Sequence, residues 1–155
     1  MEHDLFVIAR SLHVIAIVFW IGGVAFVTSV LIPAIRRTQS PENRLNLFEL
    51  LEGRFSFQAK LTTLVTGISG FYMVSVMDLW SSMSGWIHLM IFIWFIFSLV
   101  LFVFEPLFLH KWFHKQAQKN SDRTFFVLHV MHLVLLLLSI AAVFGGVAGV
   151  HGLFY

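Results

Sequence analysis

The chain has 155 residues, of which 59% are hydrophobic and only 12% are charged, and its mean hydropathy is +0.88. A soluble domain of this length does not have such a composition, which is typical of an integral membrane protein. The chain contains no cysteine, which excludes disulfides and thiolate metal sites. Its net charge is +2, and in so apolar a chain we expect the basic residues to set membrane topology rather than to bind nucleic acid.

Four apolar runs are long enough to cross a bilayer as helices, which takes about 20 residues each. They cover about 5–32, 57–77, 86–109 and 124–149. Backbone groups in lipid must be bonded within their own segment, and these runs lack the alternation of barrel strands. The sequence therefore predicts an all-α integral membrane protein, a four-transmembrane-helix antiparallel bundle that forms one domain over 1–155. We expect the first run to remain in the protein, because it is longer than the apolar part of a signal peptide.

Two connections between these runs, 33–56 and 110–123, are basic. They and the helix ends beside them hold nine of the ten Lys and Arg residues, Arg10 being the exception. Positive charge marks the cytoplasmic side of a membrane protein. We therefore expect both connections in the cytoplasm and both termini outside. Within the first connection, Pro41–Arg54 is expected to form a short interfacial helix that is capped by Ser40.

Small residues mark where the helices are expected to touch. They are Gly22 and Gly23 in the first run, Thr62, Thr66 and Gly70 in the second, and Ala142, Gly145, Gly146 and Gly149 in the fourth. Such residues let helices approach closely, which is also compatible with a homodimer. Two interpretations stay open, packing alone or small neighbours for the faces of a flat macrocycle.

A helix rises about 1.5 Å per residue, so the distance of each polar residue from the middle of its run gives its depth in the membrane. By this measure the polar side chains inside the runs form two layers. The outer layer holds His13 and His88, and the inner layer holds Lys60, Glu105, His129 and His132. An ionisable group at membrane depth is costly and marks a functional site by default.

In the outer layer, His13 and His88 could ligate one metal or one haem iron from two helices, as helical bundles commonly do. The alternative for His88 is an interfacial histidine beside Trp86 that reaches water. The alternative for His13 is a buried histidine that is satisfied by one hydrogen bond between helices.

In the inner layer, His129 and His132 are three residues apart and share a helix face. Both can act as ligands, or one can ligate while the other bonds a propionate or the backbone. Lys60 and Glu105 lie at matching depth, so we predict that they pair or that Lys60 meets a cofactor carboxylate. The pair can also be purely structural. Pro106 is expected to kink its helix.

Two further patterns are weaker. His110 and His114 have a spacing used for zinc, but they lie in a basic and aromatic stretch that is typical of a membrane interface. Four methionines could form a Cu(I) site or simply fill gaps between helices; they are Met73, Met77, Met83 and Met90.

The first run resembles a known family. Its His13, followed by Trp20, Gly22 and Gly23, is similar to the four-helix bacterial membrane protoporphyrinogen oxidases and to the related copper-resistance D membrane domain. Three short motifs agree with this, namely Glu52-Gly53-Arg54, Thr66-Gly67 with Gly70, and Trp86-Ile87-His88. The likeness covers about 5–105. The chain departs from the oxidases at Met90, where they carry a lysine.

The resemblance implies one or two b-type haems in a multi-pass protein of the bacterial inner membrane. The candidate ligands are His13, His88, His129 and His132, and the candidates to contact haem or its propionates are Arg54, Lys60, Arg10 and Trp20. We expect a cytochrome b that carries electrons, or a haem-dependent oxidoreductase, with quinone or a small oxidant as partner. The alternatives are copper transport or resistance, protoporphyrinogen oxidation and a plain membrane scaffold.

Overall fold

Two long helical hairpins build the protein, seen in a computed structural model that describes residues 2–81 and 84–153, without the side chains of 108–110. The first hairpin consists of α1 (Glu2–Phe26), the π-helical segment η1 (Val27–Leu31), α2 (Ile32–Thr38) and α3 (Pro41–Val76). The second consists of α4 (Gly85–Leu99), the π-helical segment η2 (Val100–Leu109), α5 (His110–Lys119) and α6 (Ser121–Val150). All elements in these ranges are helical, as predicted.

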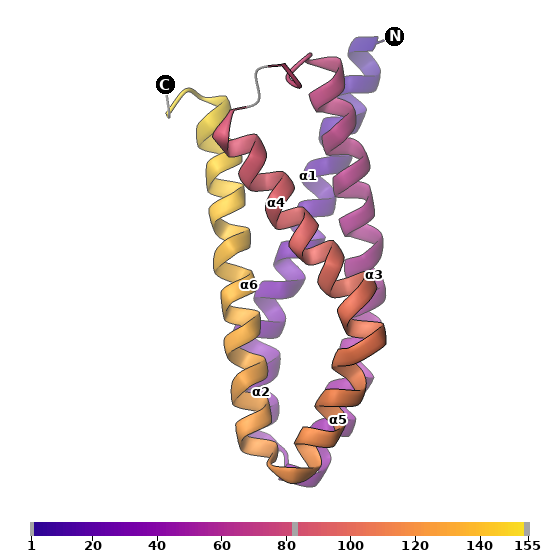
Figure 1. The fold of residues 1–155 in the computed structure, drawn as a ribbon, viewed down its shortest axis with the longest axis vertical. Coiled ribbons are helices and arrows are strands. Elements are labelled where there is room, and N and C mark those ends of the chain that lie inside the picture. The colour runs from indigo at the N-terminus through magenta and orange to yellow at the C-terminus, as the bar shows by residue number, and fades with distance from the viewer. Residues whose placement is uncertain (1, 82–83, 154–155) are drawn as a thin grey trace.

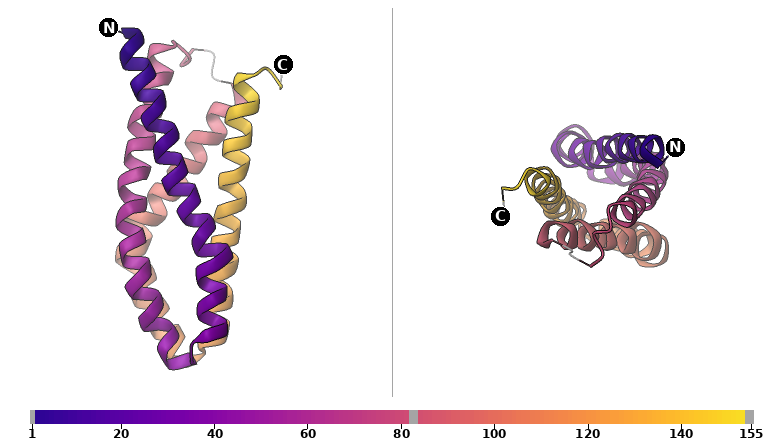
Figure 2. Two further views of the ribbon diagram at one scale, coloured as in Figure 1. Left: turned by 180° about the vertical axis from the view of Figure 1, so that it is seen from behind. Right: turned by 90° about the horizontal axis from the view of Figure 1, so that it is seen from above.

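The four long rods form a ring in the order α1, α3, α4, α6 when the bundle is seen along its axis (Figure 2). The chain starts and finishes at one end of the bundle, here called the terminal end (Figure 1). The two tight turns within the hairpins lie at the opposite end, here called the turn end. α4 begins beside α6 and crosses the bundle, so that η2 lies toward α3.

Three helical stretches are long and apolar enough to cross a membrane. They are Glu2–Thr38, Gly85–Leu107 and Ser121–Val150, within the described residues. They correspond to the first, third and fourth apolar runs of the sequence. The second run, 57–77, forms the later part of α3.

The helix α3 differs from the expectation at its beginning. It starts where predicted, with Ser40 at the N-cap position and Pro41 in the first turn, although the Ser40 side chain makes no capping hydrogen bond, and it then runs without interruption to Val76. Its 36 residues span about 54 Å, far more than a hydrocarbon core of about 30 Å. The predicted short interfacial helix is therefore wrong, and residues 41–54 extend the bundle instead. The connection 110–123 is likewise mostly helical, as α5 and the start of α6.

This extension is stable because it has an apolar core of its own. A first cluster of buried residues lies toward the turn end and comprises Val27, Ile32, Ile35, Leu45, Phe48, Phe113, Phe125 and Leu128. A second cluster lies midway along the bundle and comprises Trp20, Val24, Ala59, Ile93, Phe97 and Ala142. Leu45 and Phe48, two of the apolar residues of 41–54 that suggested a membrane interface, therefore pack in this core, whereas Leu50 and Leu51 are exposed.

Arg44 joins the two turns at the turn end. Its guanidinium donates from Nη1 to Asp122 Oδ1 at 2.5 Å, from Nη2 to the Arg36 carbonyl at 3.1 Å and from Nε to the Gln39 carbonyl at 3.1 Å. Only 11% of its side chain is exposed. One residue thus satisfies carbonyls at the end of α2 and holds the start of α6 beside them.

Pro106 lies inside η2. Proline lacks an N–H group and its ring clashes with a carbonyl one α-turn earlier. A π-helical turn is wider and shifts the bonding by one residue, and such segments often mark functional places. A kink was expected at Pro106, and the structure has a π-helical segment of ten residues there.

Candidate functional site

His13 lies half-buried on α1 and points to α3. Its Nδ1 is 2.9 Å from the Thr66 carbonyl oxygen and 3.1 Å from Ser69 Oγ. Gly70 provides the space for the ring, because a Cβ added there would come within 3.1 Å of His13 Cε1. At this height in the bundle, the small residues of α3 therefore leave room for the imidazole ring of His13.

The hydrogen bonds of His13 define its tautomer. A carbonyl oxygen only accepts, and the Ser69 hydroxyl already donates to carbonyls of its own helix, so Nδ1 must carry the hydrogen. Nε2 then keeps its lone pair and has no hydrogen-bond partner among the described residues. Histidines that bind metals usually donate from the other nitrogen to a carbonyl in this way. The geometry fulfils the packing alternative for His13 and also leaves one nitrogen able to bind a ligand.

His88 is exposed in the first turn of α4, where its Nδ1 lies 3.1 Å from the Ser84 carbonyl. Here α4 packs on α6, with the Trp86 ring against Gly149. No contact between His88 and His13 occurs in the part of the chain that the structure describes. The position of His88 agrees with the interfacial alternative.

His129 and His132 are both half-buried on α6. His132 Nδ1 lies 3.0 Å from the Leu128 carbonyl, one turn earlier on the same helix. This bond also leaves Nε2 with its lone pair, but it fixes the ring only relative to α6. Within the described residues, no three His, Asp or Glu side chains are close enough to hold a metal ion.

The pairing predicted for Lys60 and Glu105 is confirmed. Lys60 Nζ lies 3.0 Å from Glu105 Oε1, and the two side chains are 29% and 22% exposed. Ser56, which the sequence analysis missed, donates its hydroxyl to the same carboxylate oxygen at 2.5 Å. These contacts attach η2 to α3.

Glu52 extends this polar cluster by one turn. Glu52, Ser56 and Lys60 follow one another at four-residue spacing, so they share a face of α3. Burial, and then the nearby Glu105 carboxylate, raise the pKa of Glu52 to about 7, although Lys60 acts in the opposite direction. Ser56 lies four residues before Lys60, on the same helix face. This spacing was the signal in the sequence that could have identified Ser56 as a second partner of Glu105.

The glycines on the helix contacts are covered by protein side chains. A Cβ at Gly67 would meet the Trp94 ring at 2.6 Å, and one at Gly146 would meet Met90 Sδ at 2.8 Å. The Phe55 ring covers Gly23 in the same way. At Gly23 and Gly146 these contacts agree with the packing interpretation, and Gly67 on α3 is covered in the same way.

The other candidates are dispersed. Trp20 is 4% exposed and packs edge-on against Phe97, with ring centroids 4.8 Å apart. Its Nε1 has no hydrogen-bond partner among the described residues. Arg54 is exposed, and His114 Nδ1 lies 3.4 Å from Glu49 Oε1. The side chain of His110 lies outside the described part.

The methionines that could form a Cu(I) site come from two helices, Met73 and Met77 from the end of α3 and Met90 from α4. Met90 packs on Gly146 of α6. Met73 is half-buried and Met77 is exposed near the end of α3. Met83 lies outside the described residues. The structure thus gives no support to a Cu(I) site built from this set.

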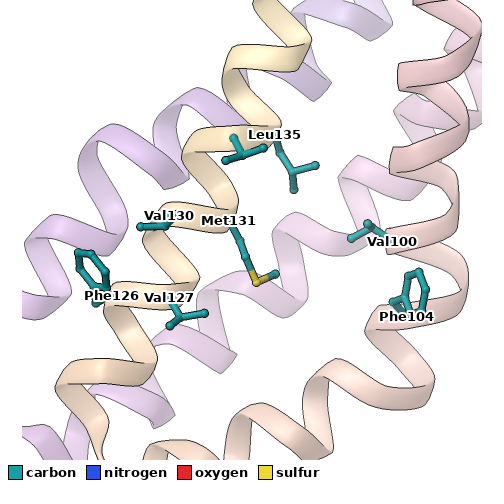
Figure 3. A pocket seen from close by; sticks show the side chains of 8 residues that line it. Val100, Phe104, Phe126, Val127, Val130, Met131 and Leu135 are labelled. Atoms are coloured by element: carbon teal, nitrogen blue, oxygen red, sulfur yellow. The ribbon is translucent and has the colours of Figure 1, made fainter.

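Two apolar grooves open between helices. The larger, of about 460 Å³, lies between η2 and α6 (Figure 3) and is lined by Val100, Phe104, Phe126, Val127, Val130, Met131, Val134 and Leu135. The smaller, of about 390 Å³, lies between α1 and α6 and is lined by Ile21, Ile140, Val143, Phe144 and Val147. No histidine is among these lining residues.

The helical fold, with three helices long and apolar enough to span a bilayer, defines a multi-pass membrane protein. Beyond this class, the chain matches no family model, no curated protein and no solved structure.

Proposed function

We propose that this protein is a membrane b-type haem protein that carries electrons, with His13 as an axial ligand. The observation that carries the proposal is the bond from His13 Nδ1 to the Thr66 carbonyl, which crosses from α1 to α3. The bonded nitrogens of His88 and His132 contact only their own helices. A ring held by a second helix is oriented before any ligand arrives, and its Nε2 retains a lone pair.

Two further features of α1 support the proposal, an apolar groove farther along the helix and a basic side chain. The groove between α1 and α6 includes Ile21, about two turns along α1 from His13. Arg10 is exposed three residues before His13, on a neighbouring part of the same face, and suits a propionate. The buried indole N–H groups of Trp20 and Trp86 have no partners among the described residues.

When bound, haem supplies one-electron redox chemistry, while the protein provides the ligand, the burial and the nearby charge that tune it. Here α1 and α3 orient the His13 ring. His88, His129 and His132 are the candidates for the other axial position or for a second haem. Lys60 is engaged by Glu105, so it reaches a propionate only if that pair opens. Quinone or a small oxidant is the partner we propose.

The later part of α3 completes a four-span topology in this proposal. Its polar side chains at 63, 66 and 69 are buried in the bundle, whereas Leu61, Leu64 and Ile68 are exposed. An apolar exterior around a polar interior is the arrangement that lipid requires. From the distribution of basic residues we propose that the turn end lies in the cytoplasm and both termini lie outside. The bacterial inner membrane is the membrane we propose, from the family resemblance.

Visible spectroscopy tests the proposal. Protein purified in detergent from haem-replete cells is expected to be red and to give reduced-minus-oxidised bands of a low-spin b haem. A colourless protein that is folded by circular dichroism would contradict it. Elemental analysis of the same sample distinguishes the copper alternative, and rescue of a strain that lacks protoporphyrinogen oxidase distinguishes the enzymatic one.

A further inference from the structure

The groove between η2 and α6, here called the η2–α6 groove, has a physical cause. Lys60 and Ser56 hold Glu105, and with it η2, against α3. Because α4 crosses from α6 toward α3, the two rods separate midway along the bundle and meet again at the turn before Ser121 (Figure 1). The space between them is therefore a consequence of defined contacts.

The wall of this groove is wholly apolar. Val100 and Phe104 form one side, and Met131 extends from α6 into the intervening space (Figure 3). A quinone ring needs donors for its carbonyl oxygens, and the groove lining provides none. A flexible hydrocarbon chain needs only apolar contact, which the lining supplies.

The end of the groove near the turn is positively charged. Arg123, Val127, Met131 and Leu135 follow at four-residue spacing, so the row of groove residues on α6 ends in an arginine. On the facing rod, Lys111, Lys115 and Lys119 are exposed on the face of α5 opposite Phe113. Because Phe113 packs on Phe125 of α6, these lysines point away from the groove, and Arg123 is the basic residue in line with it. An apolar slot that is followed by an arginine, one turn beyond its last residue on α6, matches the two chemical parts of an anionic lipid.

We propose that the η2–α6 groove binds an anionic phospholipid, with one acyl chain in the slot and the headgroup phosphate at Arg123. The groove lies between two helices that are long and apolar enough to span a membrane, and Arg123 lies in the first turn of one of them, α6. This inference does not depend on haem, because no candidate haem ligand lines the groove.

Lipid binding to the purified full-length protein tests the inference. The probes are phosphatidylglycerol and phosphatidylcholine with identical acyl chains, added in detergent and measured by native mass spectrometry. The wild type is expected to retain phosphatidylglycerol preferentially. Arg123→Gln is expected to weaken this binding about fivefold, the effect of one basic residue at a membrane surface. Arg37→Gln, at another exposed arginine near the turn end, serves as the matched charge control.

Two variants place a larger side chain in the slot from opposite sides, Val130→Trp on α6 and Val100→Phe at the start of η2. If one variant fails to fold, the other can still be tested. Either folded variant is expected to lose bound phosphatidylglycerol, whereas Leu137→Trp, at an exposed position of α6 outside the groove, is expected to retain it. Equal retention of both lipids by the wild type would overturn the inference. So would unchanged binding in a folded slot variant, or displacement of the lipid by an added quinone.

Discussion

Lys60 Nζ and Glu105 Oε1 lie 3.0 Å apart and connect α3 to the π-helical segment η2. The two residues are 45 positions apart in the chain, but they occupy the same level of the bundle. Ser56 donates to the same oxygen, so this carboxylate is satisfied from two positions of α3. The contact determines where η2 lies and thereby keeps the η2–α6 groove open.

Removing one partner of this pair is expected to be more harmful than removing both. Lys60→Met leaves a half-buried carboxylate without its counter-charge, which we expect to cost about 2 kcal/mol, below the fully buried range because both side chains are partly exposed. The double variant Lys60→Met with Glu105→Met is expected to recover most of this loss. Thermal unfolding in detergent measures the cycle, and additive single effects would show that the two groups do not interact.

The raised pKa of Glu52 predicts a specific pH dependence. With a folded-state pKa of about 7, above the ordinary value, the folded protein binds the proton more tightly than the unfolded chain does. Stability is therefore expected to fall as the pH rises from about 5 to about 7. Glu52→Gln should remove this part of the pH dependence of the melting temperature.

Glu42→Gln is the matched control for that experiment. Glu42 is exposed, and its pKa is lowered by hydrogen bonds with its own backbone and with Ser40. Its titration therefore lies below the range in which Glu52 changes charge. An equal change of slope in both variants would argue against the assignment to Glu52.

Arg44 is expected to hold the turn end together. Arg44→Met removes three hydrogen bonds and leaves the carbonyls of Arg36 and Gln39 without that donor. We expect a loss of about 1–3 kcal/mol, with earlier proteolysis near the turn between α2 and α3. Arg44→Lys should recover only part of it, because an ammonium cannot reproduce the planar fork of donors. A loss equal to that of the exposed Arg37→Met would contradict this role.

The glycines of α6 and α1 are predicted to respond differently to alanine. A Cβ at Gly149 meets the Trp86 ring, whereas one at Gly22 meets nothing within 4 Å. Gly149→Ala should therefore lower the melting temperature, because α4 and α6 must separate. Gly22→Ala should leave it unchanged or raise it, since alanine favours a helix by about 1 kcal/mol over glycine. Equal effects would mean that close packing of Trp86 is unimportant.

The features that were predicted correctly from the sequence are those that depend only on where a residue lies along its own helix. Apolar length identified the helices, and depth alone matched Lys60 with Glu105. The start of α3 followed from Ser40 and Pro41, whose effects are local.

What the sequence did not reveal depends on contacts between distant segments. The amphipathic stretch 41–54 has the same pattern at a membrane surface as against α5 and α6. Arg44 and Asp122 are 78 residues apart, and no local signal links them. The seat of His13 depends on how α1 is rotated against Gly70, and the exposure of His88 depends on how α4 is rotated against α6. Hydrophobic pattern does not specify either rotation.

The haem content of His13→Ala tests the central claim most directly. His151→Ala is the matched control, because His151 is exposed at the end of α6 and bonds only to its own helix. We predict that the pyridine haemochrome assay gives a clearly lower haem-to-protein ratio for folded His13→Ala, while His151→Ala keeps the wild-type ratio. Equal haem content in both variants, or none in the wild type, would contradict the account.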